Sequence, residues 1–524
     1  MMSAATASFP KSGAVGLATC RPRHIGIEPV LLLGASLALS LNIRDLVWKE
    51  ALIAAGLLSV IVYITVVVRH PMRLGNPLFL VLAVNLFTVP IQGLLHDLHI
   101  ADFVFEAQRG DAEYQALALE LVAAGSLAFL IGFRYLFNSV TSSRPTRAEL
   151  VPERPGVYLR GAYLLLGGWA FADAALIVMY GAIGTVYLPI SAAERYDSSL
   201  IMILQLATET GFVGLLWVAI RCNVKSSVPL SLKMLIAVAI GLHLLVIMGA
   251  GAKWHIVRLA LALLIIGEQS RWLDGKPMKS LRNYAIFAVV IIVSFRIIVP
   301  YREIARANPT WMTGSYSLSE NVGTQVRYFI QAAQMAVRRE LPPNSVESAG
   351  GRLSSLSSLM RVLSYLQGQP TYENLADTPL VPFYAVLPRT FFPNKAIFIN
   401  GGEFGHLNGL KFTAFSLTLP GSLFWIGGWP GVCIGFALLG AIMGWYWAKS
   451  LMHRDDTHVA FAMCLLANLT LWDADGPDLL IQLIRWRLTI AVVLLAAALL
   501  GGAQRQRKKL NAQRYPGTVL ASSR

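Results

Sequence analysis

Apolar stretches of roughly twenty residues recur along almost the whole chain, and no other feature constrains the fold as strongly. A helix needs roughly 20 apolar residues to cross the hydrocarbon core of a bilayer. Lipid offers the backbone no hydrogen-bond partner, so a spanning segment must be a helix or part of a closed barrel. The alternating strands of a barrel are not evident in the sequence. We therefore predict an all-α polytopic integral membrane protein with about 12 transmembrane helices.

Composition agrees with this prediction, because 524 residues that are 55% hydrophobic and only 14% charged are too apolar for a soluble globular protein. The expected spans are 29–43, 50–68, 77–96, 113–136, 159–181, 199–221, 228–248, 252–268, 283–299, 419–447, 457–475 and 481–502. The resulting organisation is a cytoplasmic lead at 1–28, nine spans within 29–299, a large basic loop at 300–418, three spans within 419–502 and a basic cytoplasmic tail at 503–524.

The net charge of +15 would suit a nucleic-acid-binding protein, but its distribution indicates a membrane topology. Most lysines and arginines fall on one side of the expected spans, whereas the short loop 97–113 on the other side is acidic. Cytoplasmic loops carry the excess of positive charge, so we expect both termini inside and residues 300–418 outside. The stretch 29–43 could be a signal-peptide core, but an uncleaved anchor keeps both basic ends on one side.

The outer segment 300–418 contains two stretches with the apolar rhythm of a helix. They run from Leu318 to Leu341 and from Gly350 to Leu366. Each predicts an amphipathic helix that either packs on the membrane body or lies in the interface. We therefore expect one large extracytoplasmic loop built from amphipathic helices.

Basic side chains accumulate in this loop, on the side of the membrane where they are least expected. Guanidinium groups bind phosphate oxygens in a bidentate manner, so the loop suits an anionic, lipid-anchored substrate. Contacts to lipid headgroups and to neighbouring carboxylates remain an ordinary alternative for any one of them. The basic residues are Arg302, Arg306, Arg327, Arg338, Arg339, Arg352, Arg361, Arg389, Lys395 and Lys411.

Two pairs of ionisable residues are further candidates for a site. Lys253 and Arg258 open the expected span 252–268, and Arg258 lies deep enough to need a polar cavity. Glu403 and His406 are three residues apart and would share a face on a helix, although adjacent glycines favour a loop. A carboxylate and an imidazole together could activate a hydroxyl group.

Other chemistry has weak support in the sequence. Asp473 and Asp475, with Asp478 nearby, resemble the two-aspartate metal motif of some sugar transferases, but polar residues are expected at the end of a span. Arg485 and Arg487, in the outer part of the last span, could pair with these aspartates. The sequence contains no Walker loop, dinucleotide fingerprint or histidine–cysteine cluster, and its four cysteines lack zinc spacing. We expect neither a metal nor a cofactor.

Three segments give the chain a resemblance to a known family. Gly251-Ala-Lys253 looks like a Gly-Ser-Arg signature with lysine in place of arginine, and the segment from Arg352 to Tyr372 resembles an outer-loop helix and turn. Leu387-Pro-Arg-Thr-Phe-Phe-Pro-Asn-Lys395 is similar to a Pro-Arg…Pro-x-Lys segment. On these residues the chain resembles the Wzy-type polymerases of O-antigen and exopolysaccharide, and the related O-antigen ligases.

The resemblance implies a metal-independent, inverting glycosyltransferase of the bacterial inner (cytoplasmic) membrane. Undecaprenyl diphosphate would leave one glycan as a hydroxyl of another lipid-linked repeat unit attacks, and the protein would position the reactants and stabilise the departing charge. The implied catalytic residues are Arg352 and Arg389, with Glu403 or His406 as base. The implied substrate-binding residues are Lys253, Arg258, Arg302, Arg339 and Lys395.

Other functions remain open at this point. A ligase needs the same leaving group as a polymerase, so the sequence does not separate them. A flippase or other carrier would line a path through its spans with cations, whereas here most of the outward ones gather in the loop. The expected partners are an undecaprenyl-diphosphate-linked glycan and the lipid bilayer, with a flippase and a chain-length regulator as protein partners and no nucleic acid.

Overall fold

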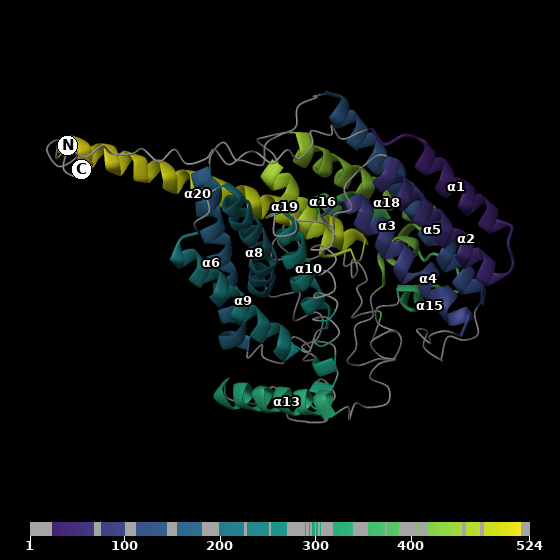
Figure 1. Cartoon of the computed structure of the whole chain (residues 1–524), viewed down its shortest axis with the longest axis horizontal. Coiled ribbons are helices and arrows are strands. Elements are labelled where there is room, and N and C mark those ends of the chain that lie inside the picture. The colour runs from purple at the N-terminus through teal and green to yellow at the C-terminus, as the bar shows by residue number, and fades with distance from the viewer. Residues whose placement is uncertain are drawn as a thin grey trace, which may run out of the picture.

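The computed structural model describes most of the chain, and all of the secondary structure in the described part is helical (Figure 1). The described residues are 24–67, 75–99, 112–143, 155–180, 199–224, 228–250, 253–269, 289, 293, 296–298, 300–301, 304, 318–338, 355–372, 375–386, 404, 407, 417–452, 457–471 and 476–514.

A first bundle joins the N-terminal helices to a long helix from near the C-terminus (Figure 1). Helices α5 and α18 form the most extensive helix pair of the described structure, and α1, α2 and α3 pack around them. The members are α1 (Glu28–Leu41), α2 (Leu46–Val62) with its π-helical end η1 (Tyr63–Val67), α3 (Pro77–Thr88), α4 (Pro90–Asp97), α5 (Ala112–Ser143) and α18 (Leu419–Met452).

The close approach of α5 to α18 depends on a small residue. A Cβ atom at Gly440 would overlap the carbonyl oxygen of Phe129 on α5. Phe129 and Phe133 line the same helix, with ring centroids 6.0 Å apart. Lipid gives helices no hydrophobic reason to associate, so tight packing of backbones supplies much of the attraction between them. Gly440 therefore holds this pair at a distance that no larger residue permits.

A second bundle contains α6 (Pro155–Tyr180), α8 (Ser199–Val224), α9 (Leu230–Ala250), α10 (Lys253–Gln269) and α20 (Gly476–Arg514). Arg160 on α6 donates from Nε to the carbonyl oxygen of Ala497 at 2.8 Å, which ties α6 to α20. The short helix α19 (Thr457–Asn468) is buried along its whole length and contacts α3, α8, α18 and α20. It therefore connects the two bundles.

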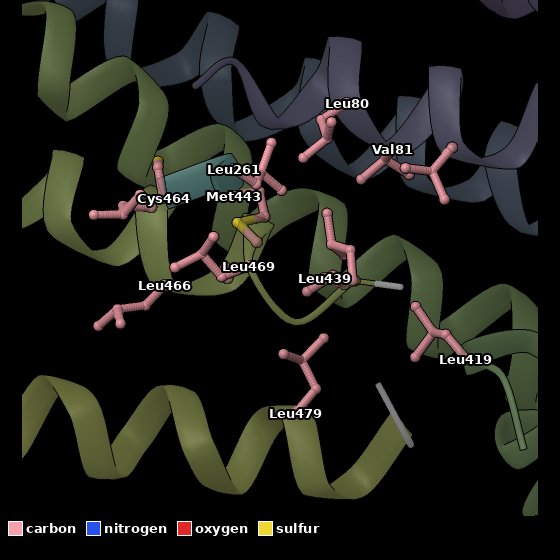
Figure 2. Packing of buried hydrophobic residues seen from close by; sticks show 14 of the residues in the cluster. Leu80, Val81, Leu261, Leu419, Leu439, Met443, Cys464, Leu466, Leu469 and Leu479 are labelled. Atoms are coloured by element: carbon pink, nitrogen blue, oxygen red, sulfur yellow. The ribbon is translucent and has the colours of Figure 1, made fainter. Parts of the chain in front are cut away.

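The two bundles share one continuous apolar core. Figure 2 shows Val81 of α3, Met443 of α18, Cys464 of α19 and Leu479 of α20 converging on the same region, together with Leu261 of α10. These residues come from helices far apart in sequence. The buried core therefore fixes the position of α20, whose first turns carry part of the candidate site described below.

Two of the expected spans contain a break. In the first, α3 ends at Thr88 and α4 begins at Pro90. Proline lacks a backbone N–H and suits the first position of a helix, so it separates the two helices. In the second, α18 breaks at Gly428, whose φ of 59° and ψ of −148° are accessible to glycine and strained for other residues. Pro430 follows two residues later.

Residues 370–371, within the segment 300–418, contact the break in α18. The hydroxyl of Thr371 donates to the carbonyl oxygen of Trp425 at 3.3 Å, and Pro370 packs against Gly428. Backbone groups within a membrane protein need such partners because lipid supplies none. Residues 370–371 thus stabilise the broken helix.

The segment 300–418 contains helices in its described part, as predicted. They are α13 (Leu318–Arg338), α15 (Ser355–Tyr365), the 3₁₀ helix η4 (Leu375–Leu380) and α16 (Val381–Val386). Helix α15 buries Leu356, Met360 and Leu363 and packs against α4, α5 and α18, so it lies on the membrane body. Burial lowers the pKa of the Arg361 guanidinium on this helix.

Eight described helical segments are long and apolar enough to cross a membrane, which makes the chain a multi-pass membrane protein by length and composition. They are Leu46–Val66, Pro77–Asp97, Ala112–Ser142, Gly156–Val178, Ile203–Ile220, Leu230–Ile247, Leu419–Leu451 and Gly476–Ala503. Three other expected spans are shorter helices, of 14 residues in α1, 17 in α10 and 12 in α19. The stretch 283–299 is described at isolated positions, so a total of twelve spans and the side on which 300–418 lies stay predictions.

Candidate functional site

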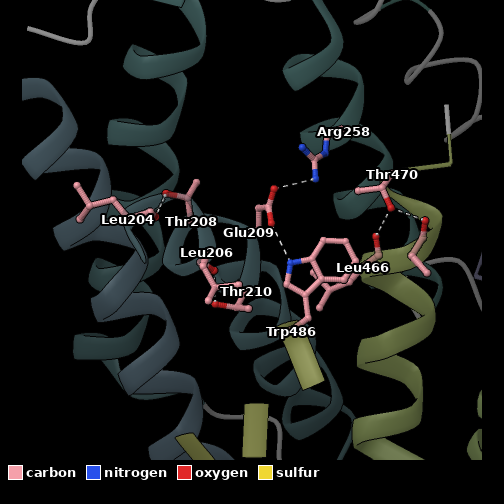
Figure 3. Close-up of polar contacts among 10 residues, drawn as sticks. Leu204, Leu206, Thr208, Glu209, Thr210, Arg258, Leu466, Thr470 and Trp486 are labelled. Carbon is pink, nitrogen blue, oxygen red and sulfur yellow. Dashed lines mark hydrogen bonds and ion pairs between the residues drawn. The ribbon is translucent and has the colours of Figure 1, made fainter. Parts of the chain in front are cut away.

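Three helices of the second bundle bring a carboxylate, a guanidinium and an indole together inside the protein (Figure 3). Trp486 of α20 donates from Nε1 to Oε2 of Glu209 on α8 at 2.8 Å. Nη2 of Arg258 on α10 lies 3.7 Å from Oε1 of the same carboxylate. Charged groups in the apolar interior of a membrane protein are costly and mark functional positions by default. These three residues are the centre of the candidate site.

The guanidinium of Arg258 is incompletely paired in this arrangement. Its Nε is buried and has no hydrogen-bond partner among the described residues. A buried donor without a partner costs about 1–3 kcal/mol. The contact with Glu209 compensates part of the charge, and the Nε–H remains able to donate to an anionic group.

A second guanidinium interacts electrostatically with the same carboxylate. Arg485, adjacent to Trp486, donates from Nε to the carbonyl oxygen of Ala385 in the last turn of α16 at 3.1 Å. Asp478 and Glu209 are the acidic groups that interact with it electrostatically. The ion pair that the sequence predicts between Arg485 and these aspartates stays a prediction. Because α16 ends at Val386, Arg485 lies where the segment 387–395 begins.

A separate polar group lies on the other side of α8. His243 of α9 places Nδ1 3.2 Å from Oδ2 of Asp173 on α6, and Asp173 is completely buried. The hydroxyl of Thr208, the neighbour of Glu209, lies 3.3 Å from Oδ1 of the same aspartate. The Trp169 ring packs edge-on against the His243 ring. Two consecutive residues of α8 therefore face two different buried polar groups.

The first bundle has its own buried polar group. Gln115 of α5 donates from Nε2 to Glu50 at 2.6 Å and to Asp97 at 3.2 Å. Lys49 of α2 is paired with Glu120 of α5. Among the described residues, no three His, Cys, Asp or Glu side chains are grouped so that they could hold a metal ion. The expected independence of metals stays a prediction.

Of the predicted site residues, Arg258 has a described side chain, which lies 3.7 Å from Glu209, and the polar cavity expected around it stays a prediction. Lys253 is the first residue of α10, five positions before it. The others lie outside the described residues and are Arg302, Arg339, Arg352, Arg389, Lys395, Glu403 and His406.

Sequence reasoning missed the acidic partner. Glu209 and Asp173 are isolated carboxylates within apolar spans, and His243 lies within another. An ionisable residue in the middle of a span is itself a signal for a functional or paired position. That signal is present in the sequence at Glu209, Asp173 and His243.

No known protein family, curated protein or solved structure matches this chain. The interpretation of the site therefore rests on its own geometry and chemistry.

Proposed function

We propose that this chain polymerises undecaprenyl-diphosphate-linked oligosaccharide repeat units at the outer face of the bacterial inner membrane. The observation that supports the proposal best is the pair of half-buried guanidinium groups, Arg258 and Arg485, which are held by neighbouring helices of a membrane protein. Arginine is the side chain best suited to bind phosphate oxygens in a bidentate manner. A lipid diphosphate brings such oxygens to a protein from within the bilayer.

The reaction moves a glycan from one lipid carrier to another. A hydroxyl oxygen of the acceptor attacks the anomeric carbon of the donor sugar from the face opposite the diphosphate. The bond from that carbon to the diphosphate oxygen breaks, and the lipid diphosphate leaves with the bonding electrons. The hydroxyl proton passes to a base, for which Glu403 and His406 are the candidates. Cationic donors stabilise the charge that develops on the leaving group.

Glu209 has a positioning role in this proposal. It orients Arg258 through the ion pair at 3.7 Å, and Trp486 orients Glu209 through the indole hydrogen bond at 2.8 Å. Groups held in advance in the geometry of the reaction lower its barrier without reorganisation. Arg485 is held by the end of α16, and the segment 387–395 with Arg389 and Lys395 follows directly. The proposal places these side chains around one diphosphate.

A complementation experiment tests the proposal. A strain lacking the gene would be complemented with the wild type, R258A, R485A, R352A and R389A, and its glycan would be separated by length. We expect single repeat units on the acceptor in every variant, with each protein still abundant in the membrane. Arg160→Ala is the matched control, because Arg160 also donates to a backbone carbonyl but lies on α6 outside the site. Wild-type chain length in R258A and R485A contradicts the proposal.

A carrier for lipid-linked glycans is the second candidate, and the polar groups inside the spans favour it. Asp173 with His243, and Glu50 with Gln115, are buried ionisable or polar groups of the kind that line transport pathways. The same strain distinguishes the two functions, because loss of a carrier retains repeat units on the cytoplasmic side. A ligase instead leaves finished polymer unattached.

A further inference from the structure

Helix α13 carries an exposed apolar stripe that no described helix covers. Val326, Ile330 and Val337 are 49%, 52% and 84% exposed, and their spacing of four and seven residues places them along one face. In Figure 1, α13 lies at the lower edge of the molecule, apart from the other labelled helices. It packs along none of the described helices. Exposed apolar side chains gathered in this way mark a surface that meets an apolar phase or a partner.

A different face of α13 is turned toward the protein. Ala332 is completely buried, and Tyr328, one turn before it, interacts electrostatically with Tyr301. Tyr301 lies two residues beyond the stretch 283–299, which the sequence predicts to cross the membrane. This electrostatic interaction indicates that α13 lies near the point at which the chain is expected to leave the bilayer, and the stripe lies on the opposite face of the helix from Tyr328.

The exposed surface of α13 next to the apolar stripe is polar and basic. Arg327, Gln331, Gln334 and Arg338 are all exposed. On a helical projection they occupy the arc next to Val326, Ile330 and Val337. An exposed surface that changes from aliphatic to cationic within one helix matches the change from acyl chains to anionic headgroups across a membrane interface.

We propose that α13 lies in the membrane interface, with Val326, Ile330 and Val337 inserted among the acyl chains and Arg327 and Arg338 among the lipid headgroups. The occupant of the stripe is the bilayer that surrounds the spans of the same chain. Helix α15 provides the contrast, because it buries its apolar face against α4, α5 and α18. The two amphipathic helices expected in the outer loop thus have different partners. The inference concerns attachment to lipid and does not depend on the proposed reaction.

Site-specific labelling in the full-length protein tests this proposal. Single cysteines would replace Val326, Ile330 or Val337, with Gln331 and Gln334 as matched positions on the polar arc, after Cys20, Cys222, Cys433 and Cys464 are changed to serine or alanine. Each variant would carry an environment-sensitive fluorophore. The proteins would be reconstituted into vesicles of phosphatidylethanolamine and phosphatidylglycerol, at a ratio that leaves one protein per vesicle.

We expect brominated acyl chains to quench the fluorophore at the three stripe positions and aqueous iodide to quench it at Gln331 and Gln334. Quenching by iodide at all five positions contradicts the proposal, because the stripe then faces water. Protection from both quenchers at the stripe also contradicts it, because another part of the protein then covers these residues. Neither result bears on the glycan assay, so failure here leaves the proposed reaction untouched.

Discussion

Trp486 donates its indole N–H to the Glu209 carboxylate over 2.8 Å, which joins α20 to α8 across 277 residues of sequence. The same carboxylate faces Arg258 on α10. The hydrogen bond from Trp486 therefore holds Glu209, the acidic partner of the half-buried Arg258 guanidinium. The geometry of the candidate site depends on this hydrogen bond.

Replacing Trp486 with phenylalanine removes the donor and retains an aromatic ring. We expect the variant to lose about 1–3 kcal/mol of unfolding free energy beyond the cost of the smaller ring, because the carboxylate loses a partner. Trp447→Phe is the matched control, because Trp447 is equally buried and its Nε1 has no partner among the described residues. Unfolding of the purified proteins in detergent measures both. Equal losses in the two variants contradict the prediction.

The contact between α5 and α18 predicts a severe effect at Gly440. A methyl group there meets the carbonyl oxygen of Phe129, so Gly440→Ala must separate the helices, at a cost of about 1–3 kcal/mol. Gly167→Ala on α6 is the control, since its Cβ atom meets nothing within 4 Å and alanine favours a helix. Melting temperature in detergent should fall for Gly440→Ala and hold or rise for Gly167→Ala. A fall of the same size in both rejects close packing as the cause.

The break in α18 predicts a difference between adjacent glycines. Gly428→Ala should cost about 1–3 kcal/mol, because its backbone conformation is strained for a residue with a Cβ atom. Gly427→Ala adds an ordinary contact, 3.9 Å from Leu375, and should be nearly neutral. Resistance to proteolysis of 370–372 should fall with Gly428→Ala, because Pro370 and Thr371 pack on the break. If both variants behave alike, the positive φ at 428 is not a determinant of stability.

The contact between Asp173 and His243 should appear as an energetic coupling. Asp173→Asn and His243→Gln each disturb a buried pair and should each destabilise the protein by about 1–3 kcal/mol. The double variant should lose less than the sum of the two, since residues in contact are not additive. A double-mutant cycle measured by unfolding in detergent gives the coupling. Strict additivity shows that the two side chains do not interact.

Most of the helical architecture could be predicted from the sequence, because a span must be apolar over a fixed length and the bilayer sets that length. The helix breaks at Val89 and Gly428 were harder to predict from the sequence, because proline and glycine also occur in unbroken membrane helices. The depth of Arg258 in its span predicts polar surroundings for its charge. Its partner Glu209 could not be identified, because pairing between distant spans depends on how the helices pack. No sequence period reports that packing.

The amphipathic rhythm of 318–341 and 350–366 predicted helices but could not assign their partners. Both sequences place apolar residues at the same helical spacing. Whether the apolar face of each helix packs on protein or on lipid depends on whether a complementary protein surface lies beside it. Leu356 and Leu363 of α15 find one on α4, α5 and α18. The equivalent stripe of α13 remains exposed in the described structure.

The contact of Thr371 with Trp425 limits how residues 367–372 can move. If residues 367–372 lifted away, the carbonyl oxygen of Trp425 and its neighbours at the break would face hydrocarbon with nothing to bind. The stretch from α15 to this turn is consequently a fixed part of the helical body rather than a mobile lid.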